Sequence, residues 1–195
     1  MILMAKRQDF QADKVHSGIL SKLHITGKQR LYLLKWTLIG ITLILLSILQ
    51  DVIFCRLRLF GAATDLLPCA IILICIMEGV ENGSVFALVA ALVYQFSGSA
   101  PGMYAMVFIT VLSVIAAIFR QSYLQKGFGA AFFCTACAFA LYEGLIFLAG
   151  LFLGHTYPER IIGFAVTWGL TLVSIPLLYP IVLFIGSIGG SIWNE

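Results

Sequence analysis

Residues 31–54 read LYLLKWTLIGITLILLSILQDVIF, the first of several long apolar runs in this chain of 195 residues. An α-helix rises about 1.5 Å per residue, so about 20 apolar residues are enough to cross the ~30 Å hydrocarbon core of a bilayer. Between Leu31 and Ser187 charged residues are few, and most of them separate one apolar run from the next. The sequence therefore predicts an all-α, polytopic membrane helix bundle.

The composition favours the same class. Hydrophobic residues make up 61% of the chain and charged residues 11%, with a mean hydropathy of +1.03. Soluble domains usually carry about 25% charged residues. A bundle of this size leaves no room for a separate soluble catalytic domain. We expect a transmembrane domain over residues 31–190, a basic cytoplasmic arm over 1–30 and a cytoplasmic tail over 191–195.

About six transmembrane helices are expected from the lengths of the apolar runs and the turn residues between them. Their predicted ranges are 31–54, 66–77, 83–96, 102–119, 128–153 and 161–185. The second and third are short for full crossings. The segment Glu78–Gly83 divides them, so they form either a tight helical hairpin or a partly re-entrant pair.

The distribution of Lys and Arg predicts the orientation, because these residues concentrate in cytoplasmic loops. With a cytoplasmic N-terminus, six spans leave only Arg56, Arg58 and Arg160 on the other side, and they return the C-terminus to the cytoplasm. The other nine basic residues are then cytoplasmic: Lys6, Arg7, Lys14, Lys22, Lys28, Arg30, Lys35, Arg120 and Lys126. The N-terminal arm is either an amphipathic helix on the membrane surface or a basic tail.

Glu143 is the first candidate for a functional residue, because it lies near the middle of the fifth predicted span. An ionised carboxylate at that depth costs at least about 2–3 kcal/mol unless it is paired or hydrated. We expect Glu143 to be protonated or hydrogen-bonded inside the bundle, beside a seam of small residues formed by Ala136, Ala140 and Gly144. Two interpretations stay open: a polar lock or ligand contact, and a structural hydrogen bond that fixes helix register.

Further candidates lie near the ends of predicted spans. Asp65 opens the second span, where its side chain or that of Thr64 is expected to cap the helix. Tyr94 lies at the non-cytoplasmic end of the third span, as an interfacial aromatic residue or a polar contact. Pro101 is expected in the first turn of the fourth helix, next to Gly102 in the turn before it.

The last predicted span contains two prolines, Pro176 and Pro180. Proline lacks a backbone donor, so each is expected to kink the helix. The hydroxyl groups of Thr171 and Ser174 are expected to bond the freed carbonyls. A kinked helix can line a cavity, but prolines are also common in ordinary membrane helices.

Sequence patterns typical of enzymes are missing. The chain has no phosphate-binding Gly-Lys loop, no HExxH motif and no pair of carboxylates at helical spacing within one span. No nucleophile stands with an evident base. We therefore expect no enzymatic activity, no metal, no cofactor and no nucleic-acid partner.

Short motifs of the predicted transmembrane domain resemble, in their order and spacing, those of the MreD family of bacterial rod shape-determining membrane proteins. These motifs are Gln50, the run Leu57–Leu67 that ends in Thr-Asp-Leu-Leu, Glu78–Gly83, Ser97–Gly102, Leu141–Glu143 and Leu178–Pro180. The chain departs from the family pattern at Thr64, where the family usually has Pro, and at Tyr94, where it commonly has Asp.

The resemblance implies a non-enzymatic scaffold of the cell-wall elongation complex in the bacterial cytoplasmic membrane. Its implied partners are a single-span MreC-like protein and, beyond it, a RodA-like synthase, a penicillin-binding transpeptidase and the MreB filament. The family's fold is similar to that of the substrate-binding subunits of energy-coupling-factor transporters. The candidate binding residues are Gln50, Asp65, Tyr94, Pro101, Gly102, Glu143 and Pro180.

Two other classes of function stay open. A vitamin-type small-molecule binding subunit of a membrane transporter fits the expected size and the central position of Glu143. Such a subunit normally needs several polar groups that converge on a pocket. A lipid-handling protein is a weaker alternative, because nothing in the sequence specifies its substrate.

Overall fold

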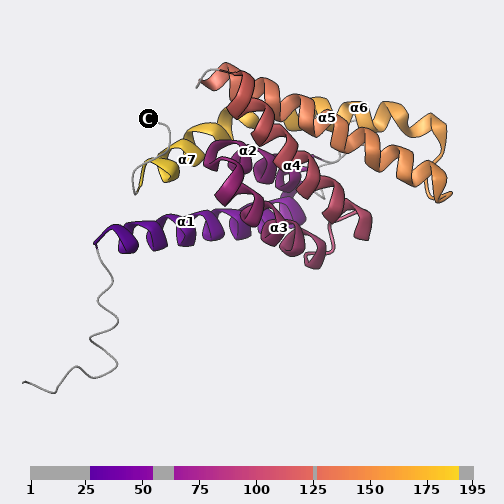
Figure 1. Ribbon diagram of the computed structural model, residues 1–195. Helices are drawn as coiled ribbons and strands as arrows, with labels where there is room; N and C mark the ends of the chain where they lie inside the picture. The colour runs from indigo at the N-terminus through magenta and orange to yellow at the C-terminus, as the bar shows by residue number, and fades with distance from the viewer. Residues whose placement is uncertain (1–26, 55–63, 125–126, 189–195) are drawn as a thin grey trace, which may run out of the picture.

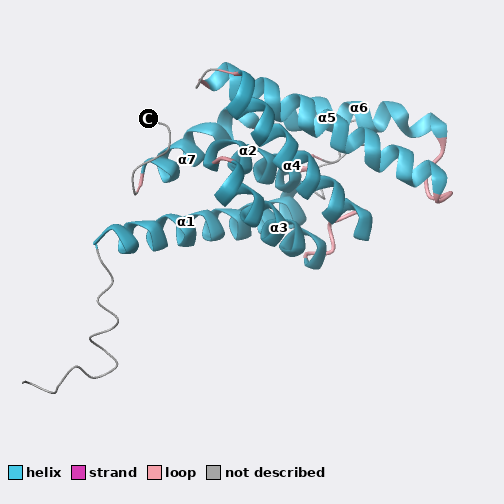
Figure 2. Cartoon of the chain, viewed as in Figure 1, coloured by secondary structure: helices cyan, strands magenta, loops and turns pink. Residues whose placement is uncertain are grey.

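A computed structural model describes residues 27–54, 64–124 and 127–188, and within these ranges the chain is helical with no strand (Figures 1 and 2). The predicted all-α class is confirmed for this part of the chain. The predicted tail at 191–195 and most of the N-terminal arm lie outside the described residues. So does most of the Leu57–Leu67 run.

Seven α-helices and two short helical segments follow one another along the described chain. They are α1 (Gly27–Leu49), the π-helical turn η2 (Gln50–Phe54), α2 (Leu66–Glu78), α3 (Val80–Phe96), α4 (Met103–Tyr123), α5 (Phe128–Phe152), the 3-10 turn η3 (Pro158–Arg160), α6 (Ile161–Leu172) and α7 (Ile175–Ser187).

By length and composition, three continuous helical segments are suited to cross a membrane, at Gln29–Ile53, Met103–Tyr123 and Phe128–Phe152. The number is four if α6 and α7, which meet at a bend of 46°, count as one broken span. Helices α2 and α3 are apolar but have only 13 and 17 residues. The described chain is therefore a helical bundle with three or four long apolar spans.

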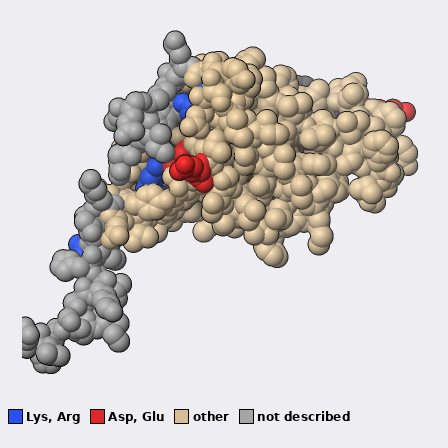
Figure 3. All heavy atoms as spheres, viewed as in Figure 1, with Lys and Arg blue, Asp and Glu red and all other residues tan. Residues whose placement is uncertain are grey.

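The surface of the bundle is largely apolar. On the face shown in Figure 3, Lys, Arg, Asp and Glu atoms are spread over the end of the molecule where α1 begins, and Asp or Glu atoms lie at the opposite tip, with uncharged residues between. Large apolar side chains such as Leu45, Val85 and Phe184 are exposed. Soluble monomers rarely expose apolar patches of this extent, so the surface fits a protein embedded in lipid.

Helix α2 lies at the centre of the bundle (Figure 1). All 13 of its residues are buried, and it packs against α1, α3, α4, α5 and α7. Its sequence, LLPCAIILICIME, is apolar on every side until the final Glu78, which is typical of a helix that is buried all round. The sequence anticipates this helix at 66–77, but it does not indicate that the other helices surround it.

Helices α2 and α3 form a hairpin whose turn is a single glycine. Gly79 has φ 84°, a left-handed conformation that favours glycine. A Cβ atom at Gly83 would lie 2.6 Å from the backbone oxygen of Cys75, so the two helices pack too closely for any side chain there. The alternative of a tight helical hairpin is confirmed, but the prediction of a longer turn over Glu78–Gly83 is wrong, because Val80 already begins α3.

The kink expected in the last predicted span is present as a break between two helices, α6 and α7, which meet at 46°. The break lies between Leu172 and Ile175, and Pro176 occupies the first turn of α7, where its missing amide hydrogen is not needed. Pro180 lies inside α7, which continues past it to Ser187. The hydroxyl of Ser174 donates to the carbonyl of Thr171 at 2.6 Å, which satisfies one of the carbonyls near the break.

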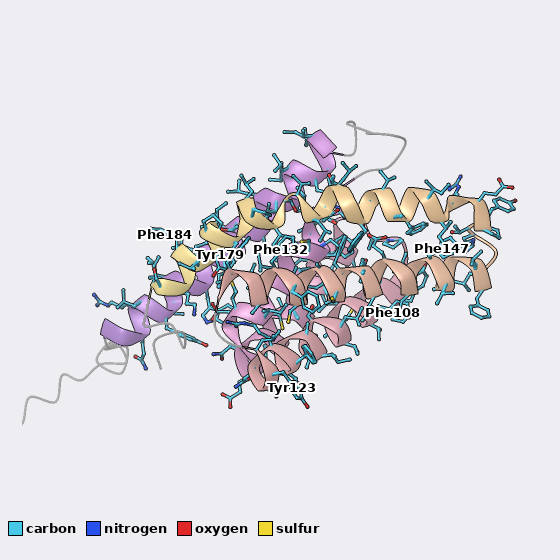
Figure 4. All side chains as sticks on the ribbon, turned by 90° about the horizontal axis from the view of Figure 1, so that it is seen from above. Phe108, Tyr123, Phe132, Phe147, Tyr179 and Phe184 are labelled. Atoms are coloured by element: carbon cyan, nitrogen blue, oxygen red, sulfur yellow. The ribbon has the colours of Figure 1, made fainter. Side chains whose placement is uncertain are left out.

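Helices α5 and α6 form a second hairpin, which extends beyond the rest of the bundle (Figure 1). The two helices lie side by side, and Phe147 of α5 is near the outer end of the hairpin (Figure 4). Thr171 is the one buried residue of the 12 in α6. Three of the other residues, Ile161, Ile162 and Ala165, are exposed, and the remaining eight are half-buried.

Candidate functional site

Gln50 connects the end of α1 to the beginning of α2. Its amide nitrogen donates to Oδ1 of Asp65 at 2.9 Å, and its amide oxygen accepts from the backbone N–H of Leu67 at 2.8 Å. The first amides of a helix have no partner within the helix. Pro68 has no amide hydrogen and needs no acceptor. The amide of Leu67, the residue before it, does need one, and Gln50 provides it. The side chain of Gln50 in η2 thus caps the first turn of α2.

The expected capping by Asp65 or Thr64 is wrong. Asp65 is the N-cap residue of α2, but its side chain makes no capping hydrogen bond, and the Oγ1 atom of Thr64 has no partner. The backbone N–H of Asp65 instead donates to the hydroxyl of Thr171 at 3.1 Å. Side chains from η2 and α6 replace the local cap, because the beginning of α2 is surrounded by other helices.

The end of α2 is held by charged side chains. Nζ of Lys35 donates to Oε2 of Glu78 at 2.5 Å, and both side chains are buried, with exposed fractions of 10% and 4%. Arg120 from α4 donates to the carbonyl oxygen of Ile76 at 2.8 Å. Cations at a helix C-terminus interact favourably with its dipole and with its unpaired carbonyls. The end of α2 is therefore satisfied inside the bundle.

Buried side chains along one face of α1 and η2 contact both ends of α2. These side chains are those of Lys35, Ile39, Leu43 and Gln50. Lys35 and Gln50 are 15 residues apart, or about 22 Å along a helix, and α2 is about 20 Å long. The two polar contacts therefore fix the axial position of α1 against α2.

A second polar group lies between α3 and α5. Tyr94 and Tyr142 are buried with exposed fractions of 0% and 1%, and Glu143 is 6% exposed. These side chains and Asp65 lie close enough to interact electrostatically. The two tyrosine hydroxyls are neighbours, but their geometry does not form a hydrogen bond, and Oε1 of Glu143 also has no partner. The structure therefore buries polar atoms here that it does not satisfy by itself.

The position of Tyr94 corrects one sequence interpretation. A fully buried side chain is not an interfacial aromatic residue. The expectation for Glu143 is met in part, since the residue is buried, but the Oε1 oxygen receives no hydrogen bond. The indole of Trp168 donates instead to the carbonyl of Ala136 at 3.1 Å.

A groove lies beside Glu143 between α5 and α6, and we call it the α5–α6 groove. Its volume is about 250 Å³. It is lined by Ala140, Glu143, Gly144 and Phe147 of α5 and by Ile161, Phe164, Ala165 and Trp168 of α6. The rings of Phe147 and Phe164 meet edge to face, with centroids 5.2 Å apart. Glu143 is the one ionisable residue of this lining.

The remaining predicted site residues lie apart from these polar groups. Pro101 precedes α4, which begins at Met103 with Gly102 as its N-cap, so the expectation of Pro101 in the first helical turn is wrong. Pro180 lies in α7. The structure therefore connects Gln50 with Asp65 and brings Asp65, Tyr94 and Glu143 together, but it does not join Pro101, Gly102 or Pro180 to them.

The sequence analysis does not anticipate the Lys35–Glu78 pair or the contact of Arg120 with α2. It counts Lys35 and Arg120 only as cytoplasmic charges, takes Glu78 only as part of the segment between two spans, and includes Tyr142 only as part of the Leu141–Glu143 motif. A charge within a long apolar run was an available signal for Lys35. The position of Tyr142 next to Glu143 was a signal for that tyrosine. Which partners they meet is decided by helix packing.

The polar contacts at the two ends of α2 join residues that are far apart in the sequence. Within the described ranges, no group of three or more His, Cys, Asp or Glu side chains is placed to hold a metal ion. Comparison with known protein families, curated proteins and solved structures finds no match to this chain.

Proposed function

We propose that this chain is a non-enzymatic membrane scaffold of the cell-wall elongation complex, which binds a single-span MreC-like protein and helps to position peptidoglycan synthases. The observation that carries the proposal is the burial of α2 over its whole length. A helix held at both ends fills the middle of the bundle, where a transporter subunit of this size would need a ligand cavity. A rigid centre with apolar outer faces is suited to protein contacts within the membrane.

The sequence resemblance to the MreD family supports the same proposal. Gln50 and Asp65, which belong to separate motifs of the resemblance, are hydrogen-bonded to each other. Tyr142 and Glu143 of a third motif lie near Asp65. Motifs distant in the sequence thus take part in one arrangement, as expected for positions that define a common fold.

The proposed setting is the bacterial cytoplasmic membrane, with six passages of the chain and both ends in the cytoplasm. Helices α2 and α3 account for two of these passages, although α2 is only about 20 Å long. A short passage is tolerable when neighbouring helices rather than lipid surround it, because its polar ends then find partners in the protein. The paired Lys35 and Glu78 mark the cytoplasmic end of α2 in this arrangement.

Co-purification tests the proposed function. The full chain is co-expressed with the MreC-like protein of the same genome and extracted in a mild detergent, with an unrelated single-span protein as the control. We expect a stoichiometric complex with the MreC-like protein alone. Equal recovery of both single-span proteins, or of neither, would count against the scaffold.

A second candidate is a vitamin-type binding subunit of a transporter, and the unpartnered polar atoms of Tyr94, Tyr142 and Glu143 favour it. Native mass spectrometry of the purified chain distinguishes the two. A stoichiometric small molecule that stays bound in the gas phase supports the binding subunit. A bare chain that still recruits its protein partner supports the scaffold.

A further inference from the structure

The α5–α6 groove has matching spacing on its two walls. On α5 the lining residues fall at positions i, i+3, i+4 and i+7 from Ala140 to Phe147, and on α6 they do so from Ile161 to Trp168. This spacing places them along one face of each helix. The two faces together line one trough, which is open on one side.

Small residues keep the trough open on the α5 side. Ala140 and Gly144 are exposed, and a Cβ atom added to Gly144 would meet nothing within 4 Å. Packing within this chain therefore does not require glycine at this position. Exposed small residues four apart on an apolar helix allow close approach of another helix in a membrane.

Glu143 places a hydrogen-bond acceptor in the lining of the groove. It lies 15 residues from the start of α5 and nine from its end, about 22 Å and 14 Å along the helix. Its side chain is nine-tenths buried and lines the groove, and its Oε1 oxygen has no hydrogen-bond partner. An occupant that donates a hydrogen bond at this depth would satisfy a group that the free chain leaves unsatisfied.

We propose that the α5–α6 groove receives one transmembrane helix of a second protein, and that this helix brings a hydrogen-bond-donating side chain to Glu143. The proposal rests on the scaffold function and names the surface through which the scaffold binds. The partner is an apolar helix with one Asn, Gln, Ser, Thr, Lys or Arg side chain near the middle of its span. A helix satisfies its own backbone, so it can lie in a groove within the bilayer.

Other occupants fit less well. Lipid presents only acyl chains at the depth of Glu143, and these donate no hydrogen bond. Ligand pockets usually enclose about 300–1,000 Å³, whereas this groove has about 250 Å³ and is open along one side. A second copy of the chain offers apolar side chains near the middle of α1, α3 and α4, such as Ile44, Leu88 and Ile115. The half-buried hydroxyl groups near the middle of these helices, those of Thr42 on α1 and Thr110 on α4, already donate to the carbonyl oxygens of Leu38 and Met106.

Binding of the MreC-like protein to three full-length variants tests the groove. Gly144→Leu fills the trough, and Gly129→Leu is its matched control, because Gly129 is an exposed glycine of the same helix with open space around it. Glu143→Leu removes the acceptor. We expect Gly129→Leu to bind as the wild type does, Gly144→Leu to lose binding, and Glu143→Leu to bind about ten-fold more weakly, in line with one hydrogen bond between membrane helices.

The outcomes separate the groove from the scaffold function. If the wild-type chain binds the partner and Gly144→Leu binds it equally well, the groove proposal is overturned and the scaffold stands. If the wild-type chain does not bind the partner, the scaffold fails, and a photo-crosslinking residue at Ala140 in the intact membrane decides the groove. A cross-link to the membrane helix of another protein, lost on Gly144→Leu, supports it, whereas a cross-link to a second copy or to lipid alone overturns it.

Discussion

Two helices of this bundle carry the same pattern of small residues four apart, and the structure uses them in opposite ways. On α3, the residues Gly83, Ala87 and Ala91 are buried against the rest of the bundle, and Gly83 touches the backbone of α2. On α5, Ala140 and Gly144 are exposed beside the α5–α6 groove. A small-residue pattern therefore predicts close helix approach, but it does not say whether the approaching helix belongs to the same chain.

The difference follows from what surrounds each helix. Helix α3 is tied to α2 by a one-residue turn, so its small residues are covered as soon as the hairpin closes. The outer part of α5 has only α6 beside it, since the hairpin extends beyond the other helices (Figure 1). Helix α2 is thus covered on all sides by this chain, whereas the α5–α6 hairpin keeps exposed small residues beside its groove. Substitutions in the two regions should have different effects on stability.

The largest loss of stability is expected from Lys35→Ala, in the centre. Removing one partner of a buried ion pair leaves the other charge unpaired and costs about 3–5 kcal/mol. The midpoint of unfolding by SDS in mixed micelles measures the loss. Replacing both Lys35 and Glu78 with Met should recover most of it, and Ala at the exposed Arg30 is the control. A midpoint unchanged by Lys35→Ala would contradict the importance of this pair.

A substitution of Gln50 tests the cap at the other end of α2. Gln50→Leu leaves the buried amide of Leu67 without an acceptor and Asp65 without its donor, which should cost about 1–3 kcal/mol. The same unfolding assay measures it, with Gln121→Leu at an exposed position of α4 as the control. Equal stability of the two variants would show that the cap does not stabilise the bundle.

The two glycines give the most direct test of the comparison. Gly83→Ala places a Cβ atom against the backbone of Cys75 and should cost about 1–3 kcal/mol, because a helix must shift. Gly144→Ala places it in open space and should change stability by less than about 0.5 kcal/mol. Similar losses of stability for both variants would mean that Gly144 is packed against other parts of the chain, as Gly83 is.

A gain of stability, and not a loss, is expected at Glu143. Glu143→Leu removes a buried carboxyl whose Oε1 oxygen has no partner, so the isolated chain should become more stable by about 1 kcal/mol. Its complex with the partner should become weaker at the same time. A variant that is less stable on its own would indicate that Glu143 stabilises the free bundle.

The sequence was sufficient for features that depend on local chemistry. Apolar length located the helices, and their predicted ranges agree closely with α1, α4 and α5. The central position of Glu143 indicated its burial, because a charge in an apolar run must avoid lipid. The kink of the last span has a local cause as well, since Pro176 begins a new helix after the break instead of bending one continuous helix.

The contacts of the candidate site depend instead on which helices meet. The caps on α2 come from Gln50, Thr171 and Arg120, which are far from it in the sequence. A local rule assigned the capping to Asp65, and the packing of the bundle overrode that rule. The burial of Tyr94 was missed for a similar reason, because a tyrosine near the end of a predicted span is expected at the membrane surface unless its neighbours are known.

The contacts that α1 and η2 make with both ends of α2 have a consequence for how the protein is made. Of the described helices that touch α2, only α1 precedes it in the chain. Lys35 and Gln50 are therefore already synthesised when Glu78 and Asp65 leave the ribosome, whereas Arg120 and Thr171 follow much later. The partners for one group at each end of α2 are therefore already part of the chain when this short apolar helix is completed.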